Sequence, residues 1–379
     1  MTEVTVFDPA TAPTDAWPDG DVSMRRYVEG IAAGGVAQMV SNVRTCWRAL
    51  RSGNRLLPLT INDGEVGDCY VCLPHSAYIL YARQELKLVD VGVLAPVIRL
   101  LIALFDKVLR AAKINRIVHV DNMLLSTNLH GDWNGEDLPA IRNALVALYP
   151  DHIIAIRSVD TWSCPELLAA CKRDQWLLMA SRQIWVTEDM ARDWRPRNGT
   201  QNDRRLLARS GLAIDELTEM TQDDARRIAA LYHLLYVGKY SPLNPVFTPA
   251  WIAMTHREGI IRYRGARDAD GQLMAVAGSL VRGGVLTAPI VGYDTARPQA
   301  EGLYRIAVWL FSEEAAAGGL RLNGSAGAAG FKRLRGAKGV IEYSALYMRH
   351  LSIRRRLALV LAAGLIEHFA VPMMRRRQL

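Results

Sequence analysis

The apolar positions of the chain recur with two different spacings, and these spacings predict an alternation of helices and strands. Apolar residues three and four positions apart predict helices, most clearly over 93–112. Short apolar runs between turn residues predict strands. In the first half we expect helices at 24–51, 93–112, 137–148 and 165–172, and strands at 56–61, 68–73, 77–82, 114–120, 152–159 and 176–187.

The second half repeats this rhythm, which favours the hypothesis of an internal duplication. Here the pattern predicts helices at 223–236, 249–257, 301–317 and 330–335, a short first strand just before Leu217, and further strands at 260–266, 273–282, 284–293, 320–323 and 340–346. A polar stretch with Pro and Gly, 189–205, separates the halves. We therefore expect a loose N-terminal tail at 1–22, domains at 23–190 and 206–350, and a basic C-terminal segment at 352–379.

The length of 379 residues and the 50% hydrophobic content suit two domains and exclude a largely disordered chain. The net charge is +8, but residues 349–379 hold seven Arg against one Glu, so residues 1–348 carry only +2. This low charge argues against a body that wraps nucleic acid.

Five cysteines in a chain of this size indicate reduced thiols and a cytoplasmic protein. Cys69 and Cys72 form a Cys-x-x-Cys pair, which we interpret as two buried small hydrophobes, with metal or redox use as the alternative. No second pair has zinc spacing, so no metal site is expected. The acidic, Pro-rich start of the chain does not resemble a secretion signal.

Two Arg clusters, 354–356 and 375–377, bracket an apolar stretch in the C-terminal segment. Pro372 and Glu367 interrupt that stretch, so a helix lying in a membrane interface fits it better than a helix crossing the membrane. The functional interpretation is peripheral contact with the anionic lipid of an inner membrane. The alternatives are a helix packed on the body with solvated Arg ends, or disordered Arg clusters.

The order of elements over 215–348 resembles the GNAT (N-acetyltransferase-like) fold. The run from Asn323 to Tyr343 makes this resemblance more specific. That run holds a strand end, a Gly-rich turn, the pair Phe331-Lys332 and a Gly before the last strand, and it is similar to the closing segment of FemAB-type transferases. The resemblance implies a bacterial protein of the α/β (α+β) class with two GNAT-like domains in tandem. Each domain would be a mixed, mostly antiparallel sheet flanked by helices, with the first domain degenerate.

The resemblance also implies transfer of an acyl or aminoacyl group to an amine. GNAT members that use acyl-CoA carry an Arg/Gln-x-x-Gly-x-Gly/Ala loop that holds the pyrophosphate. This chain has only Gln299-x-x-Gly302, with Tyr304 in place of the second small residue. Arg297 and the helix start at Gly302 are candidates for binding one donor phosphate. Tyr304 is otherwise a core residue.

Four cations fall within eight residues at 332–338, and at the mouth of a transferase site they would hold a phosphorylated donor. The resemblance points most strongly to Lys332, and Arg333 is a second donor-binding candidate. Arg335 and Lys338 complete the group. The alternative is a solvated helix face.

Amide formation needs a base for the amine, a proton for the leaving group and a donor to the oxyanion. The resemblance places these groups at the gap between the fourth and fifth strands of the second domain. The candidates there are Tyr293 and Asp294, which end one strand, and Asn323 and Ser325, which end the next. Glu342 is either a base or a solvent-facing strand residue.

The loop 238–249 would cover the acceptor amine in this fold, and it supplies Lys239, Tyr240 and Asn244 as acceptor-binding candidates. In the first half, polar residues at predicted strand ends either complete the cleft between domains or serve as caps and turns. These residues are Ser126, Thr127, Asn128, Arg157 and Ser158.

The sequence therefore predicts an N-acyltransferase without a tightly bound cofactor, acting by direct transfer from an acyl thioester to a small-molecule amine. The thioester would be carried on CoA or on an acyl carrier protein. Two alternatives remain: a FemAB-like transferase that uses aminoacyl-tRNA, and a degenerate binding module at a membrane. Sequence signatures of serine hydrolases, P-loop enzymes, dinucleotide-binding enzymes and zinc proteases are not found.

Overall fold

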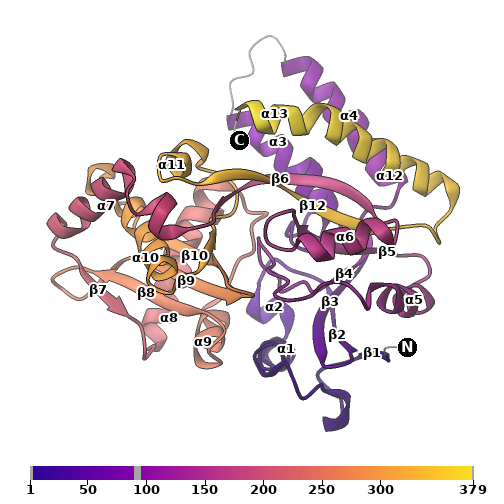
Figure 1. The fold of residues 1–379 in the computed structure, drawn as a ribbon, viewed down its shortest axis with the longest axis horizontal. Coiled ribbons are helices and arrows are strands. Elements are labelled where there is room, and N and C mark those ends of the chain that lie inside the picture. The colour runs from indigo at the N-terminus through magenta and orange to yellow at the C-terminus, as the bar shows by residue number, and fades with distance from the viewer. Residues whose placement is uncertain (1–2, 89–94, 378–379) are drawn as a thin grey trace.

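A computed structural model of the protein describes residues 3–88 and 95–377, and its strands form one twelve-stranded sheet flanked by helices (Figure 1). The strand order across the sheet is β1-β2-β3-β4-β5-β12-β6-β11-β10-β9-β8-β7. Strands β1–β5 of the first half lie on one side and β7–β11 of the second half on the other, with β12 and β6 between them. The two halves therefore share a single sheet.

The first half alternates strands and helices from β1 to β6. Its strands are β1 Val4–Phe7, β2 Cys46–Ser52, β3 Arg55–Asp63, β4 Arg116–Val120, β5 Ile153–Val159 and β6 Leu177–Thr187. Its helices are α1 Val22–Gly34, α2 Val36–Met39, α3 Tyr81–Leu88, α4 Ala95–Ala111, α5 Leu138–Leu148 and α6 Pro165–Arg173.

The second half follows with the same alternation. Its strands are β7 Ala213–Glu216, β8 Arg262–Arg267, β9 Leu273–Arg282, β10 Val285–Tyr293, β11 Arg321–Asn323 and β12 Lys338–Tyr347. Its helices are α7 Asn198–Arg209, α8 Gln222–Tyr232, α9 Pro249–Arg257, α10 Leu303–Ala317 and α11 Ala329–Arg333. The chain ends with α12 Ile353–Leu365 and α13 Val371–Arg377, which the π-helical turn Ile366–Ala370 joins.

Both halves have the same strand topology. In each, four strands pair antiparallel, and the fourth (β4 or β10) then pairs in parallel with the fifth (β5 or β11). One helix, α5 or α10, makes each parallel crossover, as a parallel connection requires. This is the order of a GNAT-like unit, so the expected fold class, two such units in tandem, is confirmed.

The last strands of the two halves are exchanged. β12, from the second half, lies between β5 and β6 and pairs antiparallel with both. β6, from the first half, pairs in turn with β11. Because each half completes the sheet of the other, the expected domain limits 23–190 and 206–350 divide one continuous sheet. The polar stretch 189–205 holds a π-helical turn and the start of α7.

Three expectations about the first 90 residues are wrong. The loose tail expected at 1–22 is wrong for its described residues 3–22, because β1 pairs with β2 from Val4 opposite Ser52 to Phe7 opposite Ala49, and residues 1–2 lie outside the described chain. The helix expected at 24–51 ends near Gly35, whose φ of 79° breaks it, and β2 follows. The strands expected at 68–73 and 77–82 are instead a turn, a π-helical segment and the start of α3. These runs are apolar because they are buried.

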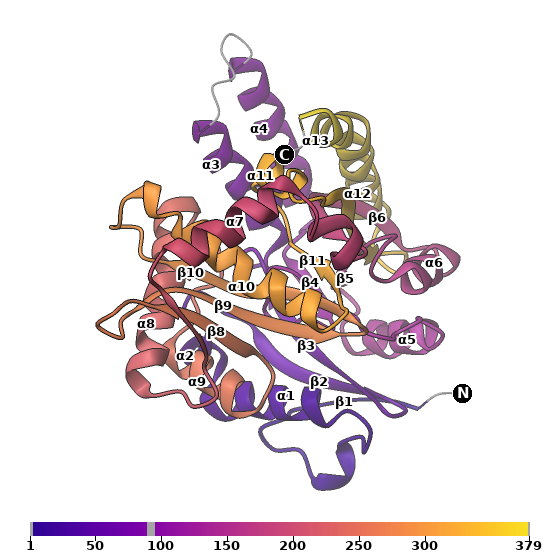
Figure 2. The same ribbon diagram turned by 60° about the vertical axis from the view of Figure 1, so that its left-hand side comes forward.

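Helices cover both faces of the sheet and bury separate cores. In the second half, α8 and α9 pack on one face together with α1, and α10 packs on the other (Figure 2). At one end of the molecule, α3, α4, α12 and α13 gather as a helical group in both views. The C-terminal segment is therefore packed on the body along α12.

Candidate active site

The β10 and β11 strands part after three residue pairs and leave a wedge. Val285–Thr287 pair with Arg321–Asn323, whereas Ile290–Tyr293 pair only with β9 among the described strands. A bulge between Thr287 and Ile290 contains Pro289, which has no N–H to donate. The wedge that the sequence predicted between the fourth and fifth strands is thus present.

On the other side of the wedge, the chain after β11 pairs with β6 instead of with β10. The Gly324 N–H donates to the Trp185 carbonyl at 2.8 Å, and the Trp185 N–H donates to the Ser325 carbonyl at 3.0 Å. Successive peptide groups of a strand point to alternate edges, so β10 presents backbone groups without ladder partners to the wedge. A free N–H there can donate to a carbonyl oxygen that gains negative charge.

Aromatic rings form a wall from β10 to α11 beside this wedge. The ring centroids of Tyr293 and Tyr304 are 6.0 Å apart, and those of Tyr304 and Phe331 are 5.1 Å apart. Tyr236, from the segment after α8, lies close enough to interact electrostatically with Tyr304 and with Tyr240. Burial raises the pKa of both Tyr236 and Tyr304, so both phenols stay protonated at neutral pH. Sequence reasoning missed Tyr236, although its four-residue spacing from Tyr240 is a helical signal.

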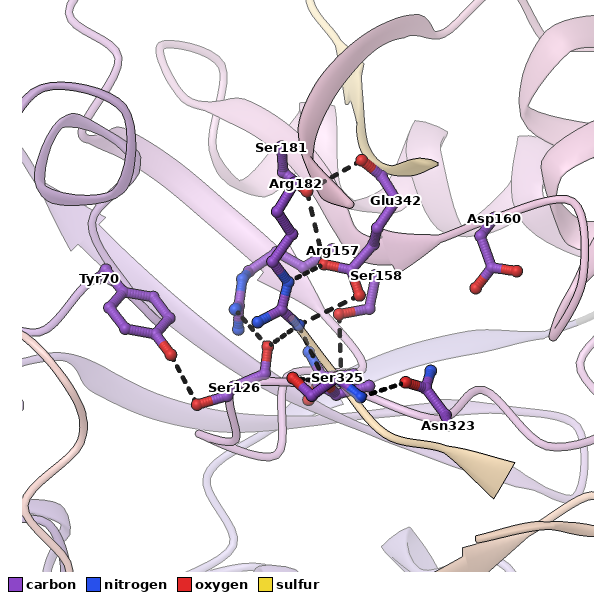
Figure 3. A network of polar contacts seen from close by, with 12 residues as sticks. Tyr70, Ser126, Arg157, Ser158, Asp160, Ser181, Arg182, Asn323, Ser325 and Glu342 are labelled. Atoms are coloured by element: carbon purple, nitrogen blue, oxygen red, sulfur yellow. Dashed lines mark hydrogen bonds and ion pairs between the residues drawn. The ribbon is translucent and has the colours of Figure 1, made fainter. Parts of the chain in front are cut away.

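A polar network lies at the centre of the sheet, where the exchanged strands meet (Figure 3). Arg182 on β6 donates from Nε to Glu342 Oε1 at 2.8 Å and from Nη2 to Oε2 at 3.2 Å. Its Nη2 also donates to the Ser126 carbonyl at 2.7 Å and to Thr127 Oγ1 at 2.8 Å. Glu342 is buried, so the expectation of a solvent-facing strand residue is wrong. Its carboxylate is bound to Arg182 across the exchanged strands.

This network reaches both the wedge and the aromatic wall. Thr127 Oγ1 donates to Ser325 Oγ at 3.1 Å, which joins the first half to the loop after β11. Tyr70 is 2.6 Å from Ser126 through its hydroxyl and interacts electrostatically with Arg182 and with the wall residue Tyr236. Ser126 and Thr127 therefore lie beside the wedge.

The other first-half candidates lie deeper. Arg157 donates to Asn122 Oδ1 at 3.1 Å and to the Leu125 carbonyl at 3.2 Å, and burial lowers the pKa of its guanidinium. The Asn128 N–H donates to Ser158 Oγ at 3.1 Å. These residues hold the loop after β4 in place.

Lys332 organises the Gly-rich loop that follows β11. Its Nζ donates to the carbonyls of Gly324, Ser325 and Ala326 at 2.6, 3.3 and 2.8 Å. Burial, with Arg182 nearby, lowers the pKa of the ammonium group to about 7. Asn323 Oδ1 accepts the Ser325 N–H at 2.9 Å within the same loop. Asn323, Ser325 and Lys332 are thus brought together at the wedge, with Lys332 bound to backbone oxygens.

The remaining donor-side candidates are spread around α10 and α11. Arg297 pairs with Glu301 at 2.9 Å on the surface. Gly302 starts α10 with φ 67°, and a Cβ there would lie 2.5 Å from Leu206 Cδ2, so only glycine fits. Arg335 is buried and paired with Asp203. Arg333 and Lys338 are exposed, so two of the four clustered cations face solvent.

The remaining catalytic and acceptor candidates differ in their surroundings. Asp294 pairs with Arg227 at 2.8 Å, and this guanidinium lowers the pKa of the carboxyl, which makes it a weak base. Lys239 lies over the Tyr240 ring, 5.9 Å from Nζ to the centroid, at the exposed edge of the wall. Asn244 is buried, and its Nδ2 donates to the Tyr236 and Ser241 carbonyls.

The equivalent wedge of the first half is filled. The loop after β4 places His130 between Asp121 Oδ2 at 2.8 Å and the Arg157 carbonyl at 2.7 Å, and His130 and Asp121 are buried. In the second half, by contrast, Ile290–Tyr293 of β10 have no strand paired on the side of β11 among the described residues.

Other parts of the molecule offer less for chemistry. Two surface hollows of about 750 and 500 Å³ flank Arg282, and neither is lined by a residue of the wedge or of the wall. Among residues 3–88 and 95–377, no three His, Cys, Asp or Glu side chains gather as metal ligands. Cys69 and Cys72 are buried, and burial raises the pKa of the Cys72 thiol to about 12.

Comparisons with known proteins find distant similarities. No protein-family profile matches the sequence, and the search of curated proteins found no significant match. Among solved structures, a tandem GNAT protein from the clavulanic acid biosynthesis pathway covers 91% of this chain and 98% of its own, with 11% identity and a TM-score of 0.40. L-PGS from Bacillus licheniformis covers 65% and 82%, with 11% identity and a TM-score of 0.46. FemX covers 60% and 80%, with 9% identity and a TM-score of 0.45.

Proposed function

We propose that the protein is an N-acyltransferase that moves an acyl group from a thioester to an amine at the wedge between β10 and β11. The observation that carries this proposal is the unpaired edge of β10 beside the aromatic wall. An extended donor can lie along such an edge and bind its backbone groups, as an added strand would.

The reaction on this proposal is a direct transfer. The acceptor first loses a proton to solvent, and the neutral amine nitrogen then attacks the thioester carbonyl to form the C–N bond, while a backbone N–H of β10 stabilises the oxyanion. The carbonyl then re-forms as the C–S bond breaks and the thiolate leaves. The thiolate takes a proton, and the new ammonium loses one to solvent. Tyr304 and Tyr236 are the candidate proton donors, because burial keeps both phenols protonated.

The carrier of the acyl group is proposed from the loop before α10 and from the exposed charges near α11. A thioester on an acyl carrier protein fits the incomplete nucleotide loop, and an acidic carrier would meet the exposed Arg333 and Lys338. Arg297 and Gly302 remain candidates for contacts with a phosphate of the donor, whether on CoA or on a carrier, whereas Lys332 would act by holding the Gly-rich loop through its three backbone carbonyls. Charged tRNA is disfavoured by the +2 charge of residues 1–348.

The acceptor is proposed to be a small amine that enters over Lys239 and Tyr240. An amine arrives in water largely as an ammonium ion, and such cations are attracted to the faces of aromatic rings. The tyrosines of the wall offer these faces. Tyr293, Asn323 and Ser325 are then the nearest candidates for positioning the nitrogen against the carbonyl.

The test incubates the purified protein with pooled acyl-CoAs, acyl carrier proteins and charged tRNAs together with an amine mixture, and detects amides by mass spectrometry. Tyr304→Phe is expected to lower kcat by about a hundredfold with little change in KM, because it removes only the hydroxyl. Tyr149→Phe, on the edge of the first-half core, is the matched control. Donor binding without amide formation would favour the binding-module alternative.

A further inference from the structure

The C-terminal segment is one continuous helix of unusual composition. Ile353–Arg375 spans 23 residues, and its most apolar 18-residue window has a mean hydropathy of 1.8, so by length and composition alone the helix could cross a membrane. Only 28% of its most apolar window is buried inside the protein. Most of the apolar surface of this helix therefore faces away from the body.

The inner face of this helix belongs to the folded core. The buried side chains of this face pack in one cluster with α4 and β6, and they are Leu359, Ala362, Ala363, Ile366 and Val371. Arg355 also ties the start of the helix to the body, donating to the carbonyls of Ala112 at 2.9 Å and Asp151 at 2.7 Å. A helix that crossed a bilayer would have to leave these contacts.

The outer face carries a row of exposed apolar side chains. Apart from the adjacent pair Val360 and Leu361, they recur every three or four residues along the helix, and they are Ile353, Leu357, Val360, Leu361, Leu365, Phe369 and Met373. Phe369 is 72% exposed, the highest value among the exposed large apolar residues of the described chain. The adjacent helix α4 adds Leu100, Leu101 and Leu104, each at least half exposed.

Basic residues surround this apolar row. Exposed or half-buried Arg residues lie at both ends of the helix, at Arg354, Arg356 and Arg375. On α4 the exposed charges are Arg99, Lys107 and Arg110. Glu367, in the π-helical turn between α12 and α13, is the one exposed acid among the described side chains of α4 and of the helix 353–375. An apolar row inside a cationic border is complementary to an anionic lipid surface.

We propose that the outer faces of α12, α13 and α4 dock the protein on an anionic lipid bilayer, with the C-terminal helix lying flat in the interface. Exposed leucines and Phe369 enter the boundary between headgroups and acyl chains, while the Arg residues contact lipid phosphates. The inner face keeps its packing on α4 and β6, so the body stays folded at the surface. This surface is separate from the wedge and does not depend on the proposed transfer.

The test measures cosedimentation of the full chain with two kinds of vesicle, pure phosphatidylcholine and an equal mixture of phosphatidylcholine and phosphatidylglycerol. Binding to the mixed vesicles is expected, weakening as salt rises. The double variant Leu361→Asp/Phe369→Asp should bind at least about tenfold more weakly, because two exposed apolar anchors are lost without touching the core. Leu148→Asp, at an equally exposed apolar position on α5, is the matched control and should bind as the wild type does.

A charge variant and an extraction separate this mode of binding from others. Arg354→Gln/Arg375→Gln should weaken binding to the anionic vesicles by about fivefold or more for the pair. Alkaline carbonate should release the bound protein. Absence of binding, equal binding to both vesicles, or wild-type binding by the Asp variant would overturn the proposal. Retention on the vesicles after carbonate would indicate a helix that spans the membrane. A dimer that the Asp variant breaks, without any vesicle binding, would indicate that a second copy of the chain covers this surface. Either result would overturn the proposal.

Discussion

The Arg182–Glu342 pair joins the exchanged strands β6 and β12, and its removal should measurably destabilise the fold. The Glu342 side chain is 4% exposed and that of Arg182 is 21% exposed. Removing one partner of a fully buried ion pair costs about 3–5 kcal/mol. Arg182 is partly solvated and keeps its bonds to Ser126 and Thr127, so we expect Glu342→Gln to lower the free energy of unfolding by about 2 kcal/mol.

The reverse change should cost more, because Arg182→Met leaves a buried carboxylate without its partner. We expect a loss of about 3 kcal/mol for Arg182→Met. The double variant should lose about 3 kcal/mol, less than the sum of the single changes, which gives a coupling of about 2 kcal/mol. Urea unfolding followed by tryptophan fluorescence and circular dichroism measures all four proteins.

An exposed pair provides the control for this cycle. Arg226 and Asp223 on α8 are 2.7 Å apart, with side chains 63% and 89% exposed, and their coupling should be below about 0.5 kcal/mol. If the effects of the Arg182 and Glu342 variants add within about 0.5 kcal/mol, the pair does not join the exchanged strands energetically, and the reasoning fails.

Three further predictions follow from single residues. Gly336 has φ 86°, and a Cβ there would lie 1.9 Å from the Asp193 carbonyl oxygen. Gly336→Ala should therefore lower the free energy of unfolding by about 3 kcal/mol. Gly330 has open space around it, so Gly330→Ala should change this free energy by less than about 1 kcal/mol, and thermal unfolding measures both variants. Lys332 has a native pKa of about 7 against about 10.5 when unfolded, so the unfolded state binds more protons between these values. Wild-type stability should therefore rise relative to Lys332→Met by roughly 3–4 kcal/mol from pH 7 to 10, and a flat difference in urea unfolding would contradict the lowered pKa. Cys46 is exposed and the other four cysteines are buried. A thiol reagent should therefore label one site in the native protein and none in Cys46→Ser. Labelling of a second cysteine at a rate equal to or above that of Cys46 would refute the assignment of Cys46 as the exposed thiol.

The amphipathic elements could be predicted from the sequence, and those that depend on distant partners could not. The helix expected at 249–257 coincides with α9, because its apolar residues form one stripe that packs on the core. The strand expected at 273–282 coincides with β9, because a central strand is apolar along most of its length. β1 has only four residues and exists because β2 pairs with it, which no local pattern records. Glu342 looked like an exposed residue because its partner Arg182 is 160 positions away.

The candidate site divides in the same way. Its position, after the strand ending at Asn323, could be read from the Gly-rich run and its resemblance to FemAB-type proteins. The roles of single side chains could not. The ammonium of Lys332 turned out to bind three backbone carbonyls, and Asn244 to shape its own loop. Tyr70 and Arg182 come from the first half, where nothing in the local sequence marks them as neighbours of this wedge.

β5 is synthesised early, but its neighbour β12 comes from the end of the chain. The side of β5 that pairs with β12 therefore stays unpaired until the ribosome has released nearly the whole chain. During synthesis, β5 and β6 thus remain open to mispairing with other nascent chains. Truncation at the midpoint would leave the same edges bare. A gene split between the halves should yield two fragments that aggregate when expressed apart and recover when expressed together.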